Sequence, residues 1–366
     1  MRRCLAVLVA ILVSLPLTAP GATAAPPRLR ARAVQSGLTN PWDVAFAPGG
    51  RMVVSTRPGF LHVFASGQPG ARRLSRLKIP RVRAEGEAGA MGVAVRKGPR
   101  GVFVYVCASR TTVEKRLWRN QVLRYRLTKT GNLRYDRFVL GGMRANTIHN
   151  GCAVEVGPGG RIWIAMGDAN DLSLPQDWNS RNGKILRVRW NGSAPKANPR
   201  RGSRIYSRGH RNPQGIAFQP GTGRVYAAEH GPQVNDEINR IVTGGNYGWP
   251  YCAGTSRANG FNRDCSRYRR PAWQSGSRTI ATSGAAFVAG EPWGSWRRSL
   301  FVSTLKQSDL RRFTIGNEGR TATRRNVAYD DRFGRLRAAT LGPGSRRPLY
   351  VTTSNNRNDK VVRIRP

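Results

Sequence analysis

The sequence has few acidic residues, histidines and cysteines. Its 366 residues include 19 Asp and Glu against 62 Lys and Arg, a formal net charge of +43, with 4 His and 5 Cys. It contains no CxxC pair, no Cys and His spacing typical of zinc and no CxxCH haem motif. The 42 Gly and 23 Pro follow no three-residue period. These absences argue against a structural zinc site, a covalently attached haem and a collagen-like chain.

Long apolar segments are absent too, apart from one at the start of the chain. Arg2 and Arg3 precede an apolar run at residues 5–17, and small residues at 22–24 form a cleavage site. This order is typical of a secretory signal peptide. The alternative, a membrane anchor, needs about 20 apolar residues, more than this run offers. We therefore expect residues 1–24 to be a signal peptide, with no transmembrane segment after its cleavage. The mature protein is expected to be secreted and extracellular, cell-wall associated or periplasmic.

Four cysteines follow this segment, and export would place them in an oxidising compartment where disulfides form. Cys252 and Cys265 flank a polar loop, so we expect them to pair and hold it in place. Cys107 and Cys152 each fall in an expected strand. They pair across neighbouring strands or remain as two buried thiols.

The large positive charge predicts adhesion to polyanions such as nucleic acid, acidic cell-wall polymers and anionic lipid. The Arg residues are scattered along the chain, and no basic helix or aromatic-interleaved basic run marks a dedicated groove. We therefore interpret the excess as a solvated cationic exterior that adheres to polyanions nonspecifically. A specific nucleic-acid partner is not expected.

A pattern of two strands joined by a Pro-containing turn recurs along the chain. The anchor prolines of its copies are Pro48, Pro99, Pro158, Pro220, Pro292 and Pro343. Their spacings of 51, 59, 62, 72 and 51 residues predict six similar units, which is typical of a six-bladed β-propeller. A pair of β-sandwiches is the alternative and fits less well, because sandwiches give no repeat of about 60 residues.

We therefore expect an all-β fold, with one six-bladed propeller domain over residues 25–366. Blades pack against one another around an axis and so bury the sheet faces that no blade can bury alone. Residues before Pro48 are expected to supply a strand to the last blade and close the ring. The longest insertion, at about residues 245–283, carries the loop between Cys252 and Cys265.

Polar clusters fall in the loops between these strands. His149 directly precedes the third repeat and is a candidate general base, or a turn residue that bonds the backbone. Arg211, in the loop at residues 206–215, suits a planar anion or a developing oxyanion. The bend at Gly231 and Pro232 exposes carbonyl groups, which are suitable ligands for Ca²⁺.

Other polar positions have ordinary explanations when each is taken alone. Residues 167–171 form a cation loop or a capped turn, and we favour the turn because the full Ca²⁺-loop spacing is missing. Lys306, Arg335 and Arg337 lie at loop edges, where surface charge is common in so basic a chain.

Four motifs make the sequence similar to a known family. They are GHRNPQG at residues 209–215, EHGP at 229–232, DEIN at 236–239 and NYGWP at 246–250. In this order they resemble the soluble quinoprotein glucose/sorbosone dehydrogenases, the aldose sugar dehydrogenases that depend on pyrroloquinoline quinone (PQQ). Further matches extend the resemblance over residues 35–364. It implies a six-bladed propeller that oxidises an aldose at the anomeric carbon to a lactone. Hydride would pass to PQQ, and the electrons would then pass to an external acceptor.

The resemblance also implies roles for individual positions. His149 corresponds to the catalytic base that takes the proton of the anomeric hydroxyl, and Arg211 to the cation that stabilises charge on the quinone. Gly231 and Pro232 correspond to backbone carbonyl ligands of a Ca²⁺ ion that anchors PQQ. The cofactor-binding positions are Asn212, Lys306, Arg335, Arg337, Thr279 and Glu87. A divalent cation and several Lys and Arg residues fit a flat tricarboxylate, which an apolar pocket alone would not hold.

The chain departs from the family pattern at some supporting positions, and two other functions stay open. The departures are Ile148, Cys152, Ala153, Thr282, Ala338 and Ala339. One alternative is a cofactor-free propeller that binds a polyanion or a protein partner. Loss of His149 or Arg211 would favour it, and both are present. The other is a Ca²⁺-dependent lactone or ester hydrolase, which needs converging carboxylates where this chain offers mainly cations and carbonyls.

Overall fold

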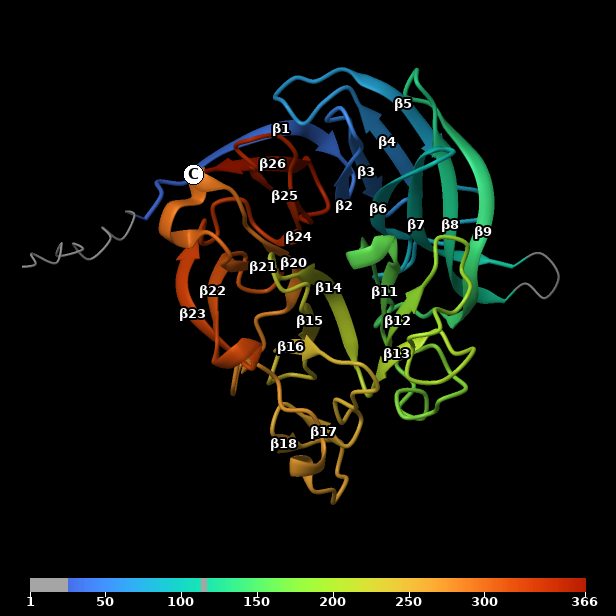
Figure 1. The fold of residues 1–366 in the computed structure, drawn as a ribbon, viewed down its shortest axis with the longest axis vertical. Helices are drawn as coiled ribbons and strands as arrows, with labels where there is room; N and C mark the ends of the chain where they lie inside the picture. Colours follow the sequence, from blue (N-terminus) through green and yellow to red (C-terminus); the bar gives the residue numbers. More distant parts are fainter. Residues whose placement is uncertain (1–25, 113–116) are drawn as a thin grey trace, which may run out of the picture.

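The computed structural model describes residues 26–112 and 117–366, which form a ring of β-sheets around a central axis (Figure 1). The predicted signal peptide, residues 1–24, lies outside the described residues. Six four-stranded sheets follow one another around the ring, and we number them as blades 1 to 6 in chain order. This arrangement confirms the predicted all-β, six-bladed β-propeller.

Each blade is antiparallel, and the first strands of successive blades contact one another around the axis. Blades 1 and 2 comprise β2 (Pro41–Phe46), β3 (Met52–Thr56), β4 (Phe60–Phe64) and β5 (Arg73–Lys78), then β6 (Ala90–Gly98), β7 (Gly101–Thr111), β8 (Trp118–Leu127) and β9 (Leu133–Arg144). Blades 3 and 4 comprise β10 (Gly151–Val156), β11 (Ile162–Met166), β12 (Lys184–Val188) and β13 (Ile205–Arg208), then β14 (Asn212–Phe218), β15 (Val225–His230), β16 (Glu237–Ile241) and β19 (Trp273–Gln274). Blades 5 and 6 comprise β20 (Thr282–Phe287), β21 (Leu300–Thr304), β22 (Leu310–Gly316) and β23 (Thr321–Ala328), then β24 (Leu336–Leu341), β25 (Leu349–Thr353), β26 (Asp359–Arg365) and β1 (Arg30–Leu38). The remaining elements are a hairpin of β17 (Cys252–Ala253) and β18 (Ser256–Arg257) and the 3₁₀ helices η1 (Pro158–Gly160), η2 (Cys265–Arg267), η3 (Glu291–Trp296) and η4 (Asn317–Gly319).

The anchor prolines mark the same place in every blade. Each one falls between the first and the second strand, as Pro48 does between β2 and β3 and Pro220 between β14 and β15. Proline has no backbone N–H and a fixed φ, so it is favoured in a turn and disfavoured inside a sheet. The spacing between the anchor prolines is therefore the number of residues from one blade to the next.

The first strand of the chain completes the last blade. Strand β1 pairs antiparallel with β26, with Arg30 opposite Arg365 and Leu38 opposite Asp359. The Asp359 carboxylate also accepts a hydrogen bond from the Asn40 backbone N–H at 3.2 Å. The prediction that residues before Pro48 close the ring is thus confirmed.

Glycines let the inner strands of neighbouring blades approach closely. A Cβ atom on Gly92 of β6 would lie 2.4 Å from the carbonyl oxygen of Cys152 on β10. A Cβ atom on Gly284 of β20 would lie 2.5 Å from the carbonyl oxygen of Arg337 on β24. Farther from the axis, apolar side chains fill the space between the sheets. Their removal from water provides the main stabilisation of the ring.

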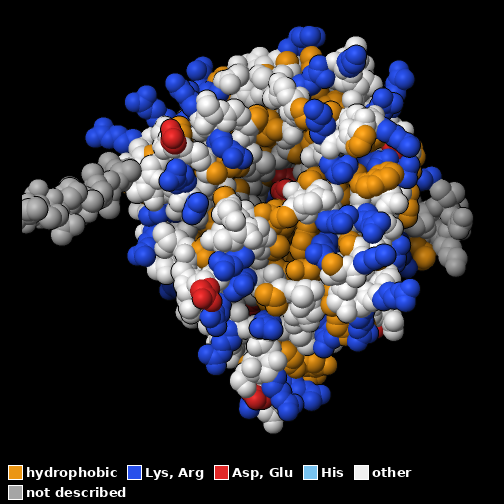
Figure 2. Space-filling view, viewed as in Figure 1, with side chains coloured by type: hydrophobic (Ala, Val, Ile, Leu, Met, Phe, Trp, Pro, Cys, Tyr) orange, Lys and Arg blue, Asp and Glu red, His pale blue; other side chains and the backbone are white. Residues whose placement is uncertain are grey.

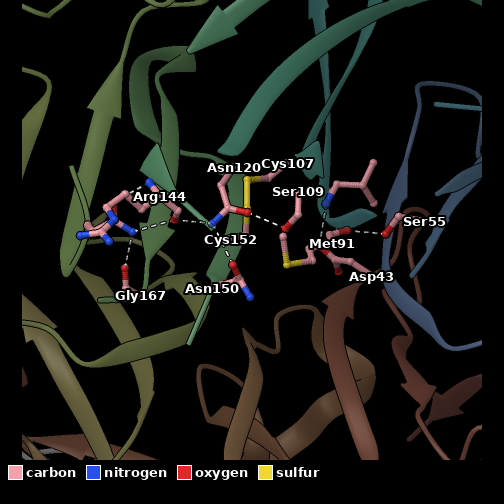
Figure 3. The surroundings of a disulfide bond; sticks show 12 residues. Asp43, Ser55, Met91, Cys107, Ser109, Asn120, Arg144, Asn150, Cys152 and Gly167 are labelled. Atoms are coloured by element: carbon pink, nitrogen blue, oxygen red, sulfur yellow. Dashed lines mark hydrogen bonds between the residues drawn. A yellow bond between two sulfur atoms is a disulfide. The ribbon is translucent and has the colours of Figure 1, made fainter. Parts of the chain in front are cut away.

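Two disulfides cross-link the described chain. Cys107 of β7 bonds to Cys152 of β10, so this bond joins blade 2 to blade 3 (Figure 3). Cys252 bonds to Cys265 and closes a loop in the long segment between β16 and β20, which also holds β19. Both predicted pairs are confirmed, and the alternative of two buried thiols is wrong. The strands of the first pair belong to different blades: β10, the inner strand of blade 3, packs against β7, the second strand of blade 2.

The surface is cationic over a wide area. Lys and Arg side chains are spread across the face in Figure 2, which is hollowed at the centre of the ring. Within the described residues, no helix is both long enough and apolar enough to cross a lipid bilayer.

Candidate active site

The turn between β9 and β10 presents His149. The φ angles of His149, Gly151 and Cys152 are positive, at 57°, 60° and 69°. A positive φ at a residue with a side chain costs of order 1 kcal/mol and persists where the surroundings impose it. Here the surroundings include the disulfide at Cys152 and a hydrogen bond of 3.0 Å from Asn120 Nδ2 to Asn150 Oδ1 (Figure 3). These contacts therefore fix the turn that carries His149.

Two carboxylates hold His149 itself. Its backbone N–H donates to Glu87 Oε2 at 3.0 Å, and its Nδ1 atom lies 2.9 Å from Asp168 Oδ1. Asp168 is fully buried, and its Oδ2 atom accepts a hydrogen bond from Trp249 Nε1 at 2.8 Å. A carboxylate at Nδ1 assigns the proton of the neutral ring to that nitrogen and leaves a free lone pair on Nε2. The ring can therefore accept a proton at Nε2.

Arg211 and Asn212 stand at the start of β14 beside this pair. The Arg211 carbonyl accepts the Asp168 N–H at 2.8 Å, and the Arg211 guanidinium lies 5.4 Å from the centre of the Trp249 ring. Its Nε atom is buried and has no hydrogen-bond partner in the described part of the chain. The same is true of both polar side-chain atoms of Asn212. Buried polar atoms are nearly always paired, so these atoms mark a place where a polar group from outside the chain would bind.

A buried polar chain supports Arg211 from within blade 4. Glu229 Oε1 accepts the Arg211 backbone N–H, and Glu229 Oε2 lies 2.8 Å from His210 Nδ1. His210 Nε2 in turn lies 2.8 Å from Ser207 Oγ. Ser207 and His210 are fully buried, so these three residues position the Arg211 backbone and face no solvent.

The bend after β15 contains Gly231 and Pro232. The buried Asp236 accepts the Gly231 N–H at 2.8 Å through Oδ1. A Cβ atom at position 231 would lie 1.9 Å from the Val234 carbonyl oxygen, so glycine is required there. The carbonyl groups of Gly231 and Pro232 accept no hydrogen bond from residues 26–112 or 117–366. Both are therefore available to coordinate a cation.

Asp236 also holds the segment before β20, which carries the predicted cofactor contact Thr279. Its Oδ2 atom accepts hydrogen bonds from Thr279 Oγ1 at 2.8 Å and from the Ala281 N–H at 2.7 Å. The Thr279 hydroxyl hydrogen is therefore used within the protein. Lys306, in the loop after β21, donates its backbone N–H to the Ile280 carbonyl at 3.1 Å, and its side chain is exposed.

Arg337 of β24 lies beside the axis. Its guanidinium stacks 3.7 Å from the centre of the Trp42 ring, and Nη1 donates to Gln214 Oε1 at 3.0 Å. Burial lowers the pKa of Arg337 to about 9, and the charge of nearby Glu87 opposes that shift. Arg335, two residues earlier, is exposed. Arg337 thus faces the interior of the site, and Arg335 lies at its edge.

His230 shows how closely the predicted residues gather. Burial lowers its pKa to about 4, so the ring is neutral, and its Nε2 atom is buried without a partner among the described residues. Four predicted residues also act on this pKa through their charges: Glu87, Arg211, Arg337 and His149. These four therefore share one site around His230, with Lys306 and Arg335 exposed to solvent.

Comparison with known proteins identifies the family. The model of the glucose/sorbosone dehydrogenase family matches residues 38–363, from the end of β1 into β26. The chain belongs to the glucose/sorbosone dehydrogenase family. Its sequence is 27% identical to the aldose sugar dehydrogenase YliI of Escherichia coli, over 94% of each chain.

Solved structures of glucose/sorbosone dehydrogenase relatives have the same fold. A PQQ-bound aldose sugar dehydrogenase from Streptomyces coelicolor is 28% identical with a TM-score of 0.76, and the match covers 93% of this chain and 100% of that chain. The apo form of the soluble aldose sugar dehydrogenase from Escherichia coli is 27% identical with a TM-score of 0.81, at the same coverage of 93% and 100%.

The sequence motifs predicted a base and several cations, but not the residues that position the base. Residues 167–171 form the turn that the sequence favoured, since Asp168 Oδ1 accepts the Asn170 N–H at 2.7 Å. The same carboxylate binds His149, which the turn alone did not indicate. Trp249 contacts Asp168 across 81 positions of sequence, and no local pattern signals this contact.

Two acids near the axis were also missed. Asp43 of β2 and Glu155 of β10 line a small cavity together with Arg337. Burial raises the pKa of Asp43 to about 7 and that of Glu155 well above its usual range, and the charge of Asp43 adds to the Glu155 shift. The Asp43 carboxylate accepts the Val93 N–H at 2.9 Å. In the sequence both acids resemble ordinary outward-facing strand residues.

Proposed function

We propose that the protein is a secreted, PQQ- and Ca²⁺-dependent dehydrogenase that oxidises aldose sugars at the anomeric carbon. The observation that carries the proposal is the His149–Asp168 pair, which lies next to the partnerless polar atoms of Arg211 and Asn212. An imidazole with a free Nε2 is suited to accept a hydroxyl proton. The neighbouring buried donors are suited to the oxygen atoms of a quinone.

The polar groups of the site fit PQQ. Among residues 26–112 and 117–366, the Asn212 amide and the Arg211 Nε–H have no hydrogen-bond partner. Arg337, Arg335 and Lys306 supply positive charge for the three carboxylates of the cofactor. Glu87 holds the His149 backbone at the same site, which suits a position near the sugar or the cofactor.

The bend after β15 fits Ca²⁺. Two carbonyl oxygens without hydrogen bonds, from Gly231 and Pro232, are hard ligands of the kind this ion prefers. Asp236 fixes the bend by binding the Gly231 N–H, so the carbonyls are preorganised. Asp236 also binds Thr279, which links the proposed metal position to a proposed cofactor contact.

When bound, PQQ with its Ca²⁺ ion would accept a hydride from the sugar and pass two electrons to an external acceptor. His149 Nε2 would take the proton of the anomeric hydroxyl, so that loss of one hydride and one proton converts the aldose to its lactone. Asp168 would stabilise the imidazolium that forms and keep the ring oriented. Arg211 would stabilise negative charge on the acceptor side.

Reconstitution with PQQ and Ca²⁺, followed by dye reduction with glucose, tests the proposal. We expect His149→Ala to bind PQQ as the wild type does and to lose turnover. Dye reduction at the wild-type rate in this variant would remove His149 from the mechanism. Failure of the wild type to bind PQQ would favour the cofactor-free alternative. Secretion is tested separately, because the amino terminus of exported protein should lie at residue 25.

A further inference from the structure

A large cavity lies on the outer flank of blade 2, apart from the proposed active site. It has a volume of about 800 Å³ and lies between β5 of blade 1 and the outer strands β8 and β9 of blade 2. It includes none of the residues proposed to bind PQQ, Ca²⁺ or the aldose. Where β8 and β9 lie in Figure 1, Figure 2 shows hydrophobic side chains surrounded by Lys and Arg. This volume lies in the range of small-molecule binding pockets, about 300–1,000 Å³.

The wall of the cavity is cationic. Four of its side chains carry positive charge: Lys78, Arg81, Arg110 and Arg119. None of the described residues that line it is Asp or Glu. Burial lowers the pKa of Arg110, and the charge of Arg81 lowers it further. An anion in the cavity would offset this repulsion, which no carboxylate among the described lining residues does.

Arg110 is fixed in place. It is 8% exposed, its Nε atom donates to the Pro80 carbonyl at 2.8 Å, and its Nη1 atom donates to Gln121 Oε1 at 2.6 Å. A guanidinium with two of its donors held by the protein loses little further side-chain entropy when it binds a ligand. Arg110 is thus a preorganised cation.

Aromatic rings line the other side of the cavity. Tyr135 is 60% exposed and Phe138 is 50% exposed, although aromatic side chains of this size are usually largely buried. Tyr135 stands edge-on to the buried Tyr125, with 5.8 Å between ring centres, which holds its orientation. Exposed, fixed aromatic faces next to cations are suited to ligands that combine flat apolar faces with negative charge.

We propose that this cavity binds an anionic oligosaccharide, a short chain of sugar rings that carry carboxylate or sulfate groups. The C–H faces of the rings would pack on Tyr135 and Phe138, and the anionic groups would pair with Arg110 and Arg119. The choice of a sugar rests on the proposed function, since a chain held here would be bound by a protein that acts on aldoses.

The cavity lies at the end of the chain segment that leads into the active site. Residues 79–89 connect β5 to β6 and include both Arg81, which lines the cavity, and Glu87, which binds His149. Within this segment the Arg83 N–H donates to the Ser109 carbonyl at 3.0 Å, so it is anchored to β7. Binding in the cavity therefore places a sugar chain on a segment that also carries an active-site residue.

Binding of a fluorescent oligogalacturonate to the full chain, without added PQQ or Ca²⁺, tests the inference. We expect the double variants Tyr135→Ser/Phe138→Ser and Arg81→Asn/Arg119→Gln each to raise Kd about tenfold, which corresponds to about 1.4 kcal/mol. Asn tolerates the positive φ of 59° at position 81. The matched control Arg324→Gln/Arg325→Gln removes the same charge from exposed positions of β23 and should leave Kd unchanged.

Three competitors complete the experiment. A neutral oligosaccharide of equal length should not displace the probe. A sulfated oligosaccharide is the second competitor. If it displaces the probe more strongly and binds more weakly to the same two variants, the binding site is supported and its ligand is a sulfated sugar. Equal weakening in the β23 control, or single-stranded DNA of equal charge binding as tightly, would overturn the inference in favour of nonspecific adhesion. Because binding is measured without PQQ, failure of the dehydrogenase proposal would not change this result.

Discussion

The contact between Asp168 and His149 allows a sharp test of the proposed base. Asp168 accepts three hydrogen bonds, from His149 Nδ1, from the Asn170 N–H and from Trp249 Nε1, at 2.9, 2.7 and 2.8 Å. The amide of an Asp168→Asn variant has one oxygen and therefore cannot accept from all three donors. Its NH₂ group must face either Trp249 or the His149 side.

Both orientations of the amide damage the site in a defined way. An NH₂ group that faces Trp249 places two buried donors, the amide NH₂ and the indole N–H, against each other with no acceptor between them. This costs about 1–3 kcal/mol of stability. An NH₂ group that faces His149 forces the imidazole proton onto Nε2, so the ring can no longer accept the sugar proton. Loss of the correct tautomer lowers kcat by about 10³ to 10⁴-fold in comparable His–Asp pairs. If the NH₂ group faces His149, we therefore expect a large fall in kcat with KM for the aldose almost unchanged; if it faces Trp249, we expect lower stability with kcat retained.

The assay is dye reduction by protein reconstituted with PQQ and Ca²⁺, with PQQ affinity measured separately. Asp171→Asn is the matched control, because Asp171 lies three positions away in the same turn and pairs with Arg144 at the surface. The control should keep the wild-type kcat. If Asp168→Asn bound PQQ and kept both the wild-type stability and the wild-type kcat, Asp168 would not position His149 for proton transfer.

Three further predictions follow from the buried polar groups and the cross-link. Asn212→Leu removes two partnerless buried polar atoms, so it should raise the unfolding free energy of the cofactor-free protein by about 1 kcal/mol while weakening PQQ binding; urea titration and PQQ fluorescence measure the two effects. The pKa of Asp43 is raised from 3.8 to about 7 on folding, so the folded state keeps a proton that the unfolded state releases. Asp43 should therefore lower stability by up to about 1.4 kcal/mol per pH unit between pH 4 and 7, and in denaturant titrations Asp43→Asn should reduce the slope by this contribution and leave that of Glu155. The double variant Cys107→Ala/Cys152→Ala opens a link with a sequence separation of 45, and its unfolding free energy should be about 4 kcal/mol lower than that of the oxidised wild type.

The fold could be predicted because its signal is local and repeated. Each blade carries its own Pro-containing turn, so the spacing from Pro48 to Pro343 already counts six units. The closing strand could be predicted as well, since six units leave the residues before Pro48 without a sheet. The position of β19 could not, because a strand as short as Trp273–Gln274 has no periodicity that separates it from the loop around it.

The site was predictable where the sequence itself carries the chemistry. His149 and Arg211 are conspicuous as residue types in polar loops, and the family motifs assigned roles to them. Asp168 and Trp249 were not, because their contact depends on how the segment after β16 folds back over blade 3. The raised pKa of Asp43 depends on burial at the axis, which alternation along a single strand does not reveal.

The pairing of β1 with β26 ties the two ends of the chain together, and this has a consequence for biosynthesis. The partner of β1 is the last strand of the propeller in chain order, so blade 6 stays incomplete until β26 has been synthesised. Until then β26 is missing and β25 presents an open edge, which is a site for aggregation. A nascent chain can assemble its middle blades early, but the ring itself can form only once β26 has left the ribosome.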